Sequence, residues 1–90
     1  EADSDDEEFN IINNYQNTGV LILDDLGLGS NVSDWLVNIL YLIINHRYEQ
    51  LKPTILTSNK SLQELADLLG DDRITSRIRR MCTVLEKEPF

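Results

Sequence analysis

One stretch constrains the fold of this chain more than any other: four aliphatic residues, two adjacent carboxylates, a leucine and a glycine, at positions 20–27. A short continuous apolar run between polar and glycine residues is typical of a strand buried on both faces of a parallel sheet. The predicted strand ends at Asp24 and Asp25, and open α/β sheets bind ligands at the carboxyl ends of their strands. Asp24 and Asp25 are therefore candidates for metal and water chemistry.

Length and charge limit what the rest of the chain can be. With 90 residues it forms one domain at most, and a domain of this size buries a smaller share of its surface than a typical one. The net charge is -8, but six of the sixteen acidic residues lie within 1–8, and the remainder carries ten acidic against eight basic residues. We predict that 1–8 is a solvated acidic segment rather than a binding surface.

The cysteine count and the lack of targeting signals favour one compartment. Cys82 is the single cysteine, so an internal disulfide is excluded, and a reduced, cytoplasmic setting is the simpler interpretation. No apolar run reaches membrane-spanning length, and the acidic start is the opposite of a secretory signal peptide. We expect a cytoplasmic protein with no membrane partner.

Hydrophobic spacing and turn residues predict the elements of the first two thirds of the chain. They indicate a helix at about 6–16, a strand at 20–23, a loop at 26–31, a long helix that begins after Ser33 and ends before Pro53, and a buried strand at 54–57. A strand, a helix and a strand in this order predict a βαβ unit with parallel pairing and a right-handed crossover.

The last third of the chain begins with a local sequence motif that marks the start of a helix without any hydrophobic repeat. Ser61-Leu62-Gln63-Glu64 is a capping box, and Gly70 is the natural end of the short helix that follows. Asp71 or Asp72 can cap a further helix, from Arg73 to about Arg80, and 82–86 is predicted as a third strand.

Three blocks of sequence together resemble a known family. They are Val-Leu-Ile-Leu-Asp-Asp-Leu-Gly at 20–27, Pro-Thr-Ile-Leu-Thr-Ser-Asn at 53–59 and Gly-Asp-Asp-Arg-Ile-Thr-Ser-Arg-Ile at 70–78. In this order and spacing they resemble the AAA+ ATPases of the bacterial helicase-loader group (DnaC, DnaI and IstB types), and the likeness runs from about residue 18 to residue 86. No Gly-x-x-x-x-Gly-Lys-Ser/Thr phosphate loop (P-loop) occurs in these 90 residues.

The resemblance implies an α/β fold: the C-terminal half of a P-loop NTPase (AAA+) domain, a three-layer sandwich with a parallel sheet that lacks the P-loop strand. Residues 1–17 form an acidic head with a short helix, and 18–90 form the partial ATPase domain. In the family the P-loop strand lies between the strands that correspond to 54–57 and 82–86. We therefore expect unpaired strand edges there, which the last strand fills by shifting or a second copy fills by dimerising or swapping elements.

Each block carries a site residue if the resemblance holds. Asp24 is the Walker B ligand of Mg²⁺, which prefers carboxylates and phosphate oxygens, and Asp25 orients or deprotonates the attacking water. Asn59 is the sensor 1 residue, whose amide can hydrogen-bond the water or the γ-phosphate. Arg77 is the preferred arginine finger, acting on the nucleotide of a neighbouring subunit, with Arg73 as the second choice. The remaining arginines, Arg79 and Arg80, are weaker candidates and could touch nucleic acid or acidic partners instead.

The same residues allow simpler interpretations. Asp24 and Asp25 can be a capped turn after a core strand, Asn59 can be a turn residue, and the arginines can be a solvated helix face. His46 and Cys82 have no second ligand at metal spacing and are expected to be structural, so no zinc or nucleophilic site is predicted. A phosphoacceptor receiver domain, which also begins with paired acids, is excluded because the second strand ends in Thr-Ser-Asn rather than aspartate.

The resemblance also implies partners for the longer parent protein. ATP and Mg²⁺ are its cofactors, it forms a homo-oligomer, and its clients are a replicative helicase and single-stranded DNA or, in the IstB branch, a transposase and target DNA. The 90 residues alone are expected to bind no cofactor and to be inactive because they lack the phosphate loop. A non-catalytic interaction module on the same scaffold stays open as a different class of function.

Overall fold

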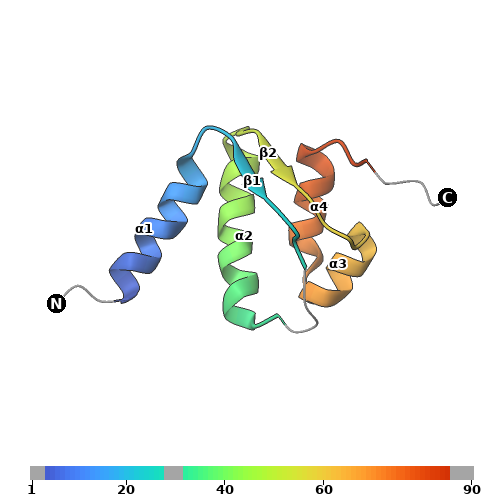
Figure 1. Cartoon of the computed structure of the whole chain (residues 1–90), viewed down its shortest axis with the longest axis horizontal. Coiled ribbons are helices and arrows are strands. Elements are labelled where there is room, and N and C mark those ends of the chain that lie inside the picture. Colours follow the sequence, from blue (N-terminus) through green and yellow to red (C-terminus); the bar gives the residue numbers. More distant parts are fainter. Residues whose placement is uncertain (1–3, 28–31, 86–90) are drawn as a thin grey trace.

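The structure is a computed structural model that describes residues 4–27 and 32–85. Its elements in chain order are α1 (Ser4–Asn17), β1 (Leu21–Leu23), α2 (Asp34–Glu49), β2 (Thr54–Leu56), α3 (Leu62–Leu69) and α4 (Asp72–Met81) (Figure 1). The two strands are parallel, with Leu21 beside Thr54 and Leu23 beside Leu56. The predicted βαβ order and parallel pairing are confirmed. The predicted loop at 26–31 falls partly outside the described residues.

Local caps set the ends of the helices as the sequence predicts. Ser33 precedes α2, and its hydroxyl accepts a hydrogen bond from the Leu36 amide at 3.1 Å. Before α3, Ser61 and Glu64 form the reciprocal capping box, and Gly70 ends that helix in the left-handed conformation with φ 67°. These signals are strictly local, which is why the sequence alone locates them.

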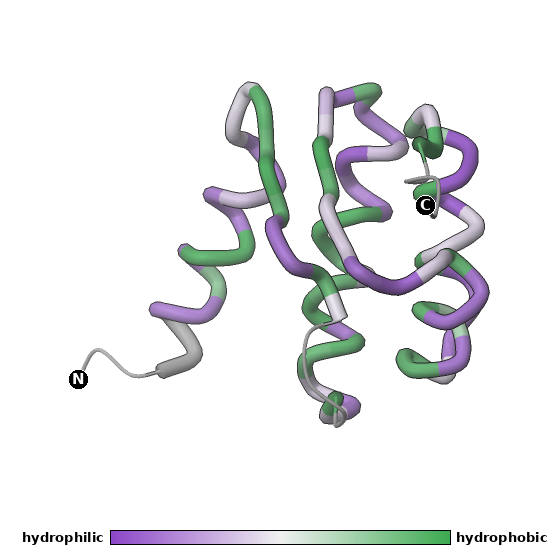
Figure 2. The backbone as a smooth tube through the Cα atoms, turned by 45° about the vertical axis from the view of Figure 1, so that its right-hand side comes forward, coloured by the Kyte–Doolittle hydropathy of each residue, from purple (hydrophilic) through white to green (hydrophobic). Residues whose placement is uncertain are grey.

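The hydrophobic core lies between α2, α3, α4 and one face of the sheet. Its buried members are Leu40, Ile44, Leu69, Ile74 and Ile78, and partly buried Leu23 and Leu56 of the two strands pack against them. Figure 2 shows the apolar residues of both strands and of α2 along the chain path. Each strand thus contributes alternate residues to the core, as a pleated strand does when only one of its faces is covered.

The other face of the sheet is open, which contradicts the prediction that the first strand is buried on both faces. Ile22 is 62% exposed and its register partner Ile55 is 51% exposed, while Leu21 is buried. Within the described residues the helices cover one face only, so the fold has two layers rather than the predicted three. An unbroken aliphatic run favours burial on both faces, but burial also requires a second covering layer, and none is provided by residues 4–27 and 32–85.

The predicted third strand is also not found in the part of it that the structure describes. Cys82 ends α4, and 82–85 forms no strand, while the last predicted residue lies outside the described part. The Cys82 thiol does approach the outer edge of β2, where its sulfur lies 3.6 Å from the carbonyl oxygen of Thr54. The outer edge of β2 presents backbone groups that a further strand could pair with. Among the described residues, however, no backbone hydrogen bond joins 82–85 to β2, so no ladder forms.

Helix α1 is held against the rest of the fold by polar contacts. The Trp35 indole of α2 donates to Glu8 at 3.0 Å, and the Gln16 amide donates to the Leu42 carbonyl at 3.2 Å. The third anchor is Arg47, whose side chain is fully buried. Its guanidinium donates to five backbone carbonyl oxygens and one hydroxyl, those of Tyr15, Gln16, Thr18, Gly19, Pro53 and Thr54.

Candidate functional site

The two predicted acids lie where the parallel strands end together. Asp24 and Asp25 follow β1 directly, and Thr57 follows β2. The Thr57 amide donates to the Leu23 carbonyl at 2.9 Å, and the Leu26 amide donates to the Thr57 carbonyl at 2.7 Å. Backbone hydrogen bonds therefore join the turn after β1 to the turn after β2. The two turns lie at the carboxyl ends of the strands, where the sequence predicts the site.

The Thr57 side chain joins the two acids more closely. Its hydroxyl donates to Asp24 Oδ1 and accepts from the Asp25 amide at 2.8 Å. Asp25 has a positive φ of 58°, an uncommon conformation for a residue other than glycine. Thr57 is not among the site residues predicted from the sequence, because threonine is common in strands and carries no signal of its own there.

Asn59 belongs to the neighbouring turn, and this turn is also bound to the acid turn. The Ser58 hydroxyl donates to the Leu26 carbonyl at 2.5 Å and accepts from the Lys60 amide at 3.0 Å. Asp24, Asp25 and Asn59 are all exposed. The structure thus brings the three predicted residues to adjacent turns that are open to solvent.

Gly27 allows α3 to pack closely against this site. Its φ is 84°, and a Cβ atom there would lie 2.6 Å from Cδ2 of the buried Leu65. The backbone conformation strongly favours glycine, and a Cβ atom would in addition force the Leu65 side chain to shift. The glycine after the acid pair is therefore explained by packing, without a role in binding phosphate.

The described residues offer oxygen ligands for a cation but no complete metal site. Among the side chains that the structure describes, no three from His, Cys, Asp or Glu are grouped so that they could hold a metal ion. Asp24, Asp25 and Asn59 present carboxylate and amide oxygens, the hard donors that Mg²⁺ prefers. Because Mg²⁺ keeps several waters and uses one or two carboxylates together with substrate phosphates, this donor set fits it.

The predicted arginine fingers lie elsewhere, along the contact between α4 and α2. Arg77 Nε donates to Asn45 Oδ1 at 2.6 Å, and Arg77 Nη1 donates to the Arg73 carbonyl at 3.1 Å. The guanidinium carbon of Arg77 is 5.2 Å from the ring centre of Tyr41 and 5.9 Å from that of Tyr48. Among the described residues, Arg77 therefore makes no contact with Asp24 or Asp25 of the same chain.

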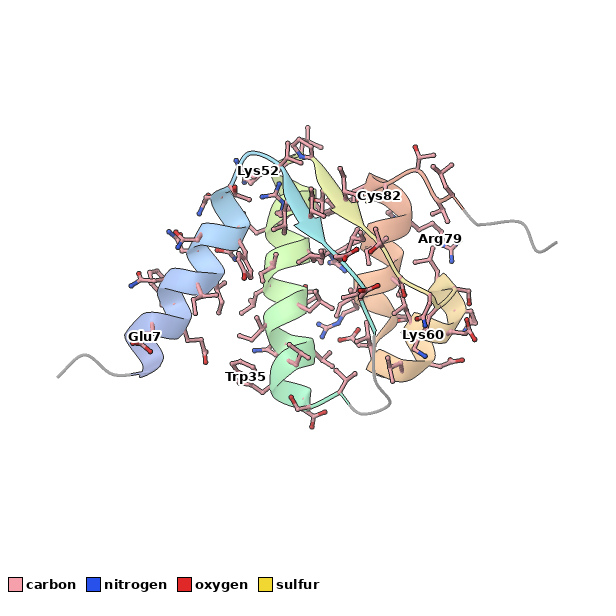
Figure 3. The ribbon with its side chains drawn as sticks, in the orientation of Figure 1. Glu7, Trp35, Lys52, Lys60, Arg79 and Cys82 are labelled. Atoms are coloured by element: carbon pink, nitrogen blue, oxygen red, sulfur yellow. The ribbon has the colours of Figure 1, made fainter. Side chains whose placement is uncertain are left out.

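Arg73 lies one turn earlier on the same helix. It forms a salt bridge of 2.7 Å with Asp71, the N-cap of α4, and its guanidinium carbon is 4.4 Å from the centre of the Tyr41 ring. The hydrogen bonds from Arg73 hold the pKa of the Asp71 carboxyl below its ordinary value. Arg79, in contrast, points away from the sheet at the outer side of α4 (Figure 3).

Replacing Asp71 by alanine is expected to destabilise the chain by about 1 kcal/mol, because both the cap and the ion pair are lost. The folded pKa of Asp71 is depressed, so its stabilisation is complete above the unfolded value of about 3.9 and is lost as pH falls through the folded value. Urea unfolding at neutral and acid pH checks this. The D72A variant is the control, and an equal loss in both variants at neutral pH would contradict a specific role for the cap.

Comparison with known proteins identifies the family. Residues 1–86 match the family described as IstB-like ATP binding protein. The chain belongs to this family. It is 34% identical over 67 residues to the uncharacterized protein YqaM of Bacillus subtilis (strain 168), covering 70% of this chain and 21% of that protein. It is 30% identical over 76 residues to the phage-like element PBSX protein XkdC of the same strain, covering 80% of this chain and 28% of that protein. No solved structure matches significantly.

Membership in the IstB-like family supports the predicted type of protein but not the predicted activity. It supports a fragment of an AAA+ ATPase, which is the coarser part of the sequence-based resemblance. The chain spans less than a third of either relative, so the activity of a whole IstB-like protein is a matter for proposal. None of the described helices has the length and apolar character needed to cross a membrane.

Proposed function

We propose that this chain is the part of an ATP-dependent helicase loader that supplies the Mg²⁺ ligand, the water-orienting groups and an arginine finger. The observation that carries the proposal is the pair of hydrogen-bonded turns in which Asp24, Asp25 and Asn59 follow two parallel strands. The family match supports ATP binding by the longer protein. The P-loop that would hold the phosphates does not occur in these 90 residues.

Within this proposal each site residue has a separate task. Asp24 holds Mg²⁺, directly or through water, and Mg²⁺ when bound neutralises charge on the phosphates. Asp25 accepts a hydrogen bond from the attacking water, or its proton, and Asn59 orients that water or the γ-phosphate. Arg77 or Arg73 acts on the nucleotide of the adjacent subunit, which requires a homo-oligomer with a repeating head-to-tail interface.

Two alternatives remain within reach of experiment. An IstB-like transposition ATPase would use the same site, with a transposase and target DNA in place of a replicative helicase and single-stranded DNA. The family description, IstB-like ATP binding protein, supports this alternative. A non-catalytic interaction module would keep the scaffold and lose the chemistry.

The test is ATP hydrolysis by the longer protein that contains this chain. Replacing Asp25 by asparagine is expected to lower kcat by about 10²-fold or more, the size typical of removing a general base, while ATP binding persists. The 90 residues alone should show no ATP binding by calorimetry. Unchanged hydrolysis in D25N would reject the catalytic role of Asp25, whereas no hydrolysis by the unsubstituted longer protein would favour the interaction module. Stimulation by a replicative helicase, or instead by a transposase, separates the two ATPase branches.

A further inference from the structure

Thr57 is placed to control the geometry of both acids. Its single hydroxyl is used twice, as a donor to the Asp24 carboxylate and as an acceptor for the Asp25 amide. Because a hydroxyl has one proton and two lone pairs, it can make both bonds at once. No other side chain among the described residues bonds to either of these groups. Threonine at position 57 therefore links the backbone of one acid to the side chain of the other.

The two bonds have different consequences. The bond to Asp24 Oδ1 occupies one carboxylate oxygen and limits rotation of the carboxylate, so that Oδ2 remains available for a cation. The bond to the Asp25 amide stabilises a backbone conformation with φ 58°, which is unfavourable for a residue with a side chain. That conformation determines the direction in which the Asp25 side chain leaves the backbone. One hydroxyl thus orients both acids.

We infer that Thr57 is a positioning residue that sets the relative orientation of the Asp24 and Asp25 carboxylates for cation and water binding. This role deepens the proposed function and rests on it, because the proposed function states what the orientation of the two carboxylates is for. It assigns Thr57 no contact with ATP. The segment after β2 then contributes two residues to the site: Thr57 orients the two acids, and Asn59 acts directly.

The structure provides an internal reference for the test. The Asp25 amide donates to the Thr57 hydroxyl, whereas the Leu26 amide donates to the Thr57 backbone carbonyl at 2.7 Å. Replacing Thr57 by valine removes the hydroxyl and keeps the shape and the carbonyl. Replacing it by serine keeps the hydroxyl. Faster exchange of the Asp25 amide alone therefore indicates loss of the hydroxyl, whereas faster exchange of both amides indicates unfolding of the turn.

Amide hydrogen exchange of the 90-residue chain, followed by NMR, is the first measurement. In T57V the Asp25 amide should exchange about tenfold faster or more, the effect of losing one hydrogen bond, while Leu26 exchange is unchanged. T57S should resemble the parent chain. If the Asp25 amide exchanges at the parent rate in T57V, the hydroxyl does not hold that backbone and the inference is overturned. Faster exchange at both amides in T57V and T57S alike would also overturn it, since the effect would not follow the hydroxyl.

Excess Mn²⁺ in place of Mg²⁺ provides the second measurement, because paramagnetic broadening of the amides at 24–27 reports contact that is too weak and transient to count as cofactor binding by the 90 residues. The T57V chain should need several-fold more Mn²⁺ than T57S for the same broadening, and D24N should abolish it. Equal broadening in T57V and T57S would reject orientation of the acids by the hydroxyl. If the parent chain shows no local broadening while its exchange results hold, the proposed cation role of Asp24 is wrong and the geometric link through Thr57 stands.

Discussion

Replacing Arg47 by methionine should destabilise the chain by about 3 kcal/mol or more, which is the largest single effect on stability that we expect. Arg47 is fully buried, and its guanidinium satisfies five carbonyl oxygens and one hydroxyl. Methionine has a similar length and no donors, so these acceptors would lose their bonds to the guanidinium. Of the five carbonyls, only that of Pro53 would keep another partner among the described residues, the Leu21 amide. An unsatisfied buried polar group costs about 1–3 kcal/mol, and a domain of this size has little stability in reserve.

The bonds of Arg47 also explain why the loss should spread. They join the end of α1, the segment that leads into β1 and the residues at the start of β2, with the shortest, 2.6 Å, to the Pro53 carbonyl. Two of the acceptors are carbonyls in the last turn of α1 and a third, that of Thr18, directly follows the helix, where the helix dipole favours a positive charge. Burial lowers the pKa of Arg47, but a guanidinium starts so high that it stays charged.

Urea unfolding monitored by circular dichroism checks the Arg47 prediction. Arg80 is exposed and lies on α4, so R80M is a control for loss of a positive charge and should change the stability by less than about 0.5 kcal/mol. R47K keeps the charge but has three donors instead of five, so it should fall between the parent and R47M. Equal stability of R47M and R80M would contradict the anchoring role.

What the sequence predicts well in this chain is local. The Ser33 cap, the Ser61 capping box and the left-handed Gly70 each involve residues within one helical turn, and all are present in the structure. The pairing of the two strands follows from their order around α2. The meeting of Asp24 with the turn that holds Asn59 then follows, because parallel strands end at the same edge.

What the sequence does not reveal depends on distant partners. Arg47 lies in the last turn of α2, where a basic residue is common, and its acceptors in and after α1 are backbone groups 28 to 32 positions away. The side chains of those acceptor residues carry no pattern that identifies an arginine site. The double use of the Thr57 hydroxyl is hidden for the same reason, since both of its partners lie across the sheet.

The open sheet face shows where a local pattern misleads. Val20, Ile22 and Ile55 are all more than half exposed, although the aliphatic run predicts burial on both sides. Apolar residues on a free face and a free β2 edge are features that attract other strands or chains. The predicted self-association of this chain remains a prediction, and the exposed face of the sheet is the surface through which we expect it.

Replacing Arg77 by alanine in the longer protein should lower ATP hydrolysis by about 10³-fold to 10⁵-fold if Arg77 is the arginine finger. Arg77 makes hydrogen bonds to Asn45 and to the Arg73 carbonyl, and none of its contacts among the described residues is with Asp24 or Asp25. An arginine that serves a neighbouring subunit would have this arrangement. So would an arginine that only fastens α4 to α2, so the loss in R77A does not by itself separate the two roles.

Mixing two inactive variants separates them. R77A keeps its acid pair and D25N keeps its arginine, so an interface that combines the first variant's acids with the second variant's arginine has a complete site. Activity should therefore return when the two proteins are mixed, if the site is shared between subunits. N45A tests the structural role, because it removes the Arg77 partner on α2 and leaves the guanidinium in place.

The results together distinguish two cases by their pattern. Recovery on mixing, with R79A and N45A retaining most of the activity, assigns the finger to Arg77. No recovery, with N45A as inactive as R77A, assigns Arg77 to the packing of α4 on α2 and leaves Arg73 as the remaining predicted finger. For Arg73 to act on a neighbouring nucleotide it must first leave its 2.7 Å salt bridge with Asp71. A finger at Arg73 therefore predicts that D71A raises ATP hydrolysis by the longer protein, whereas with a finger at Arg77 this hydrolysis is independent of Asp71.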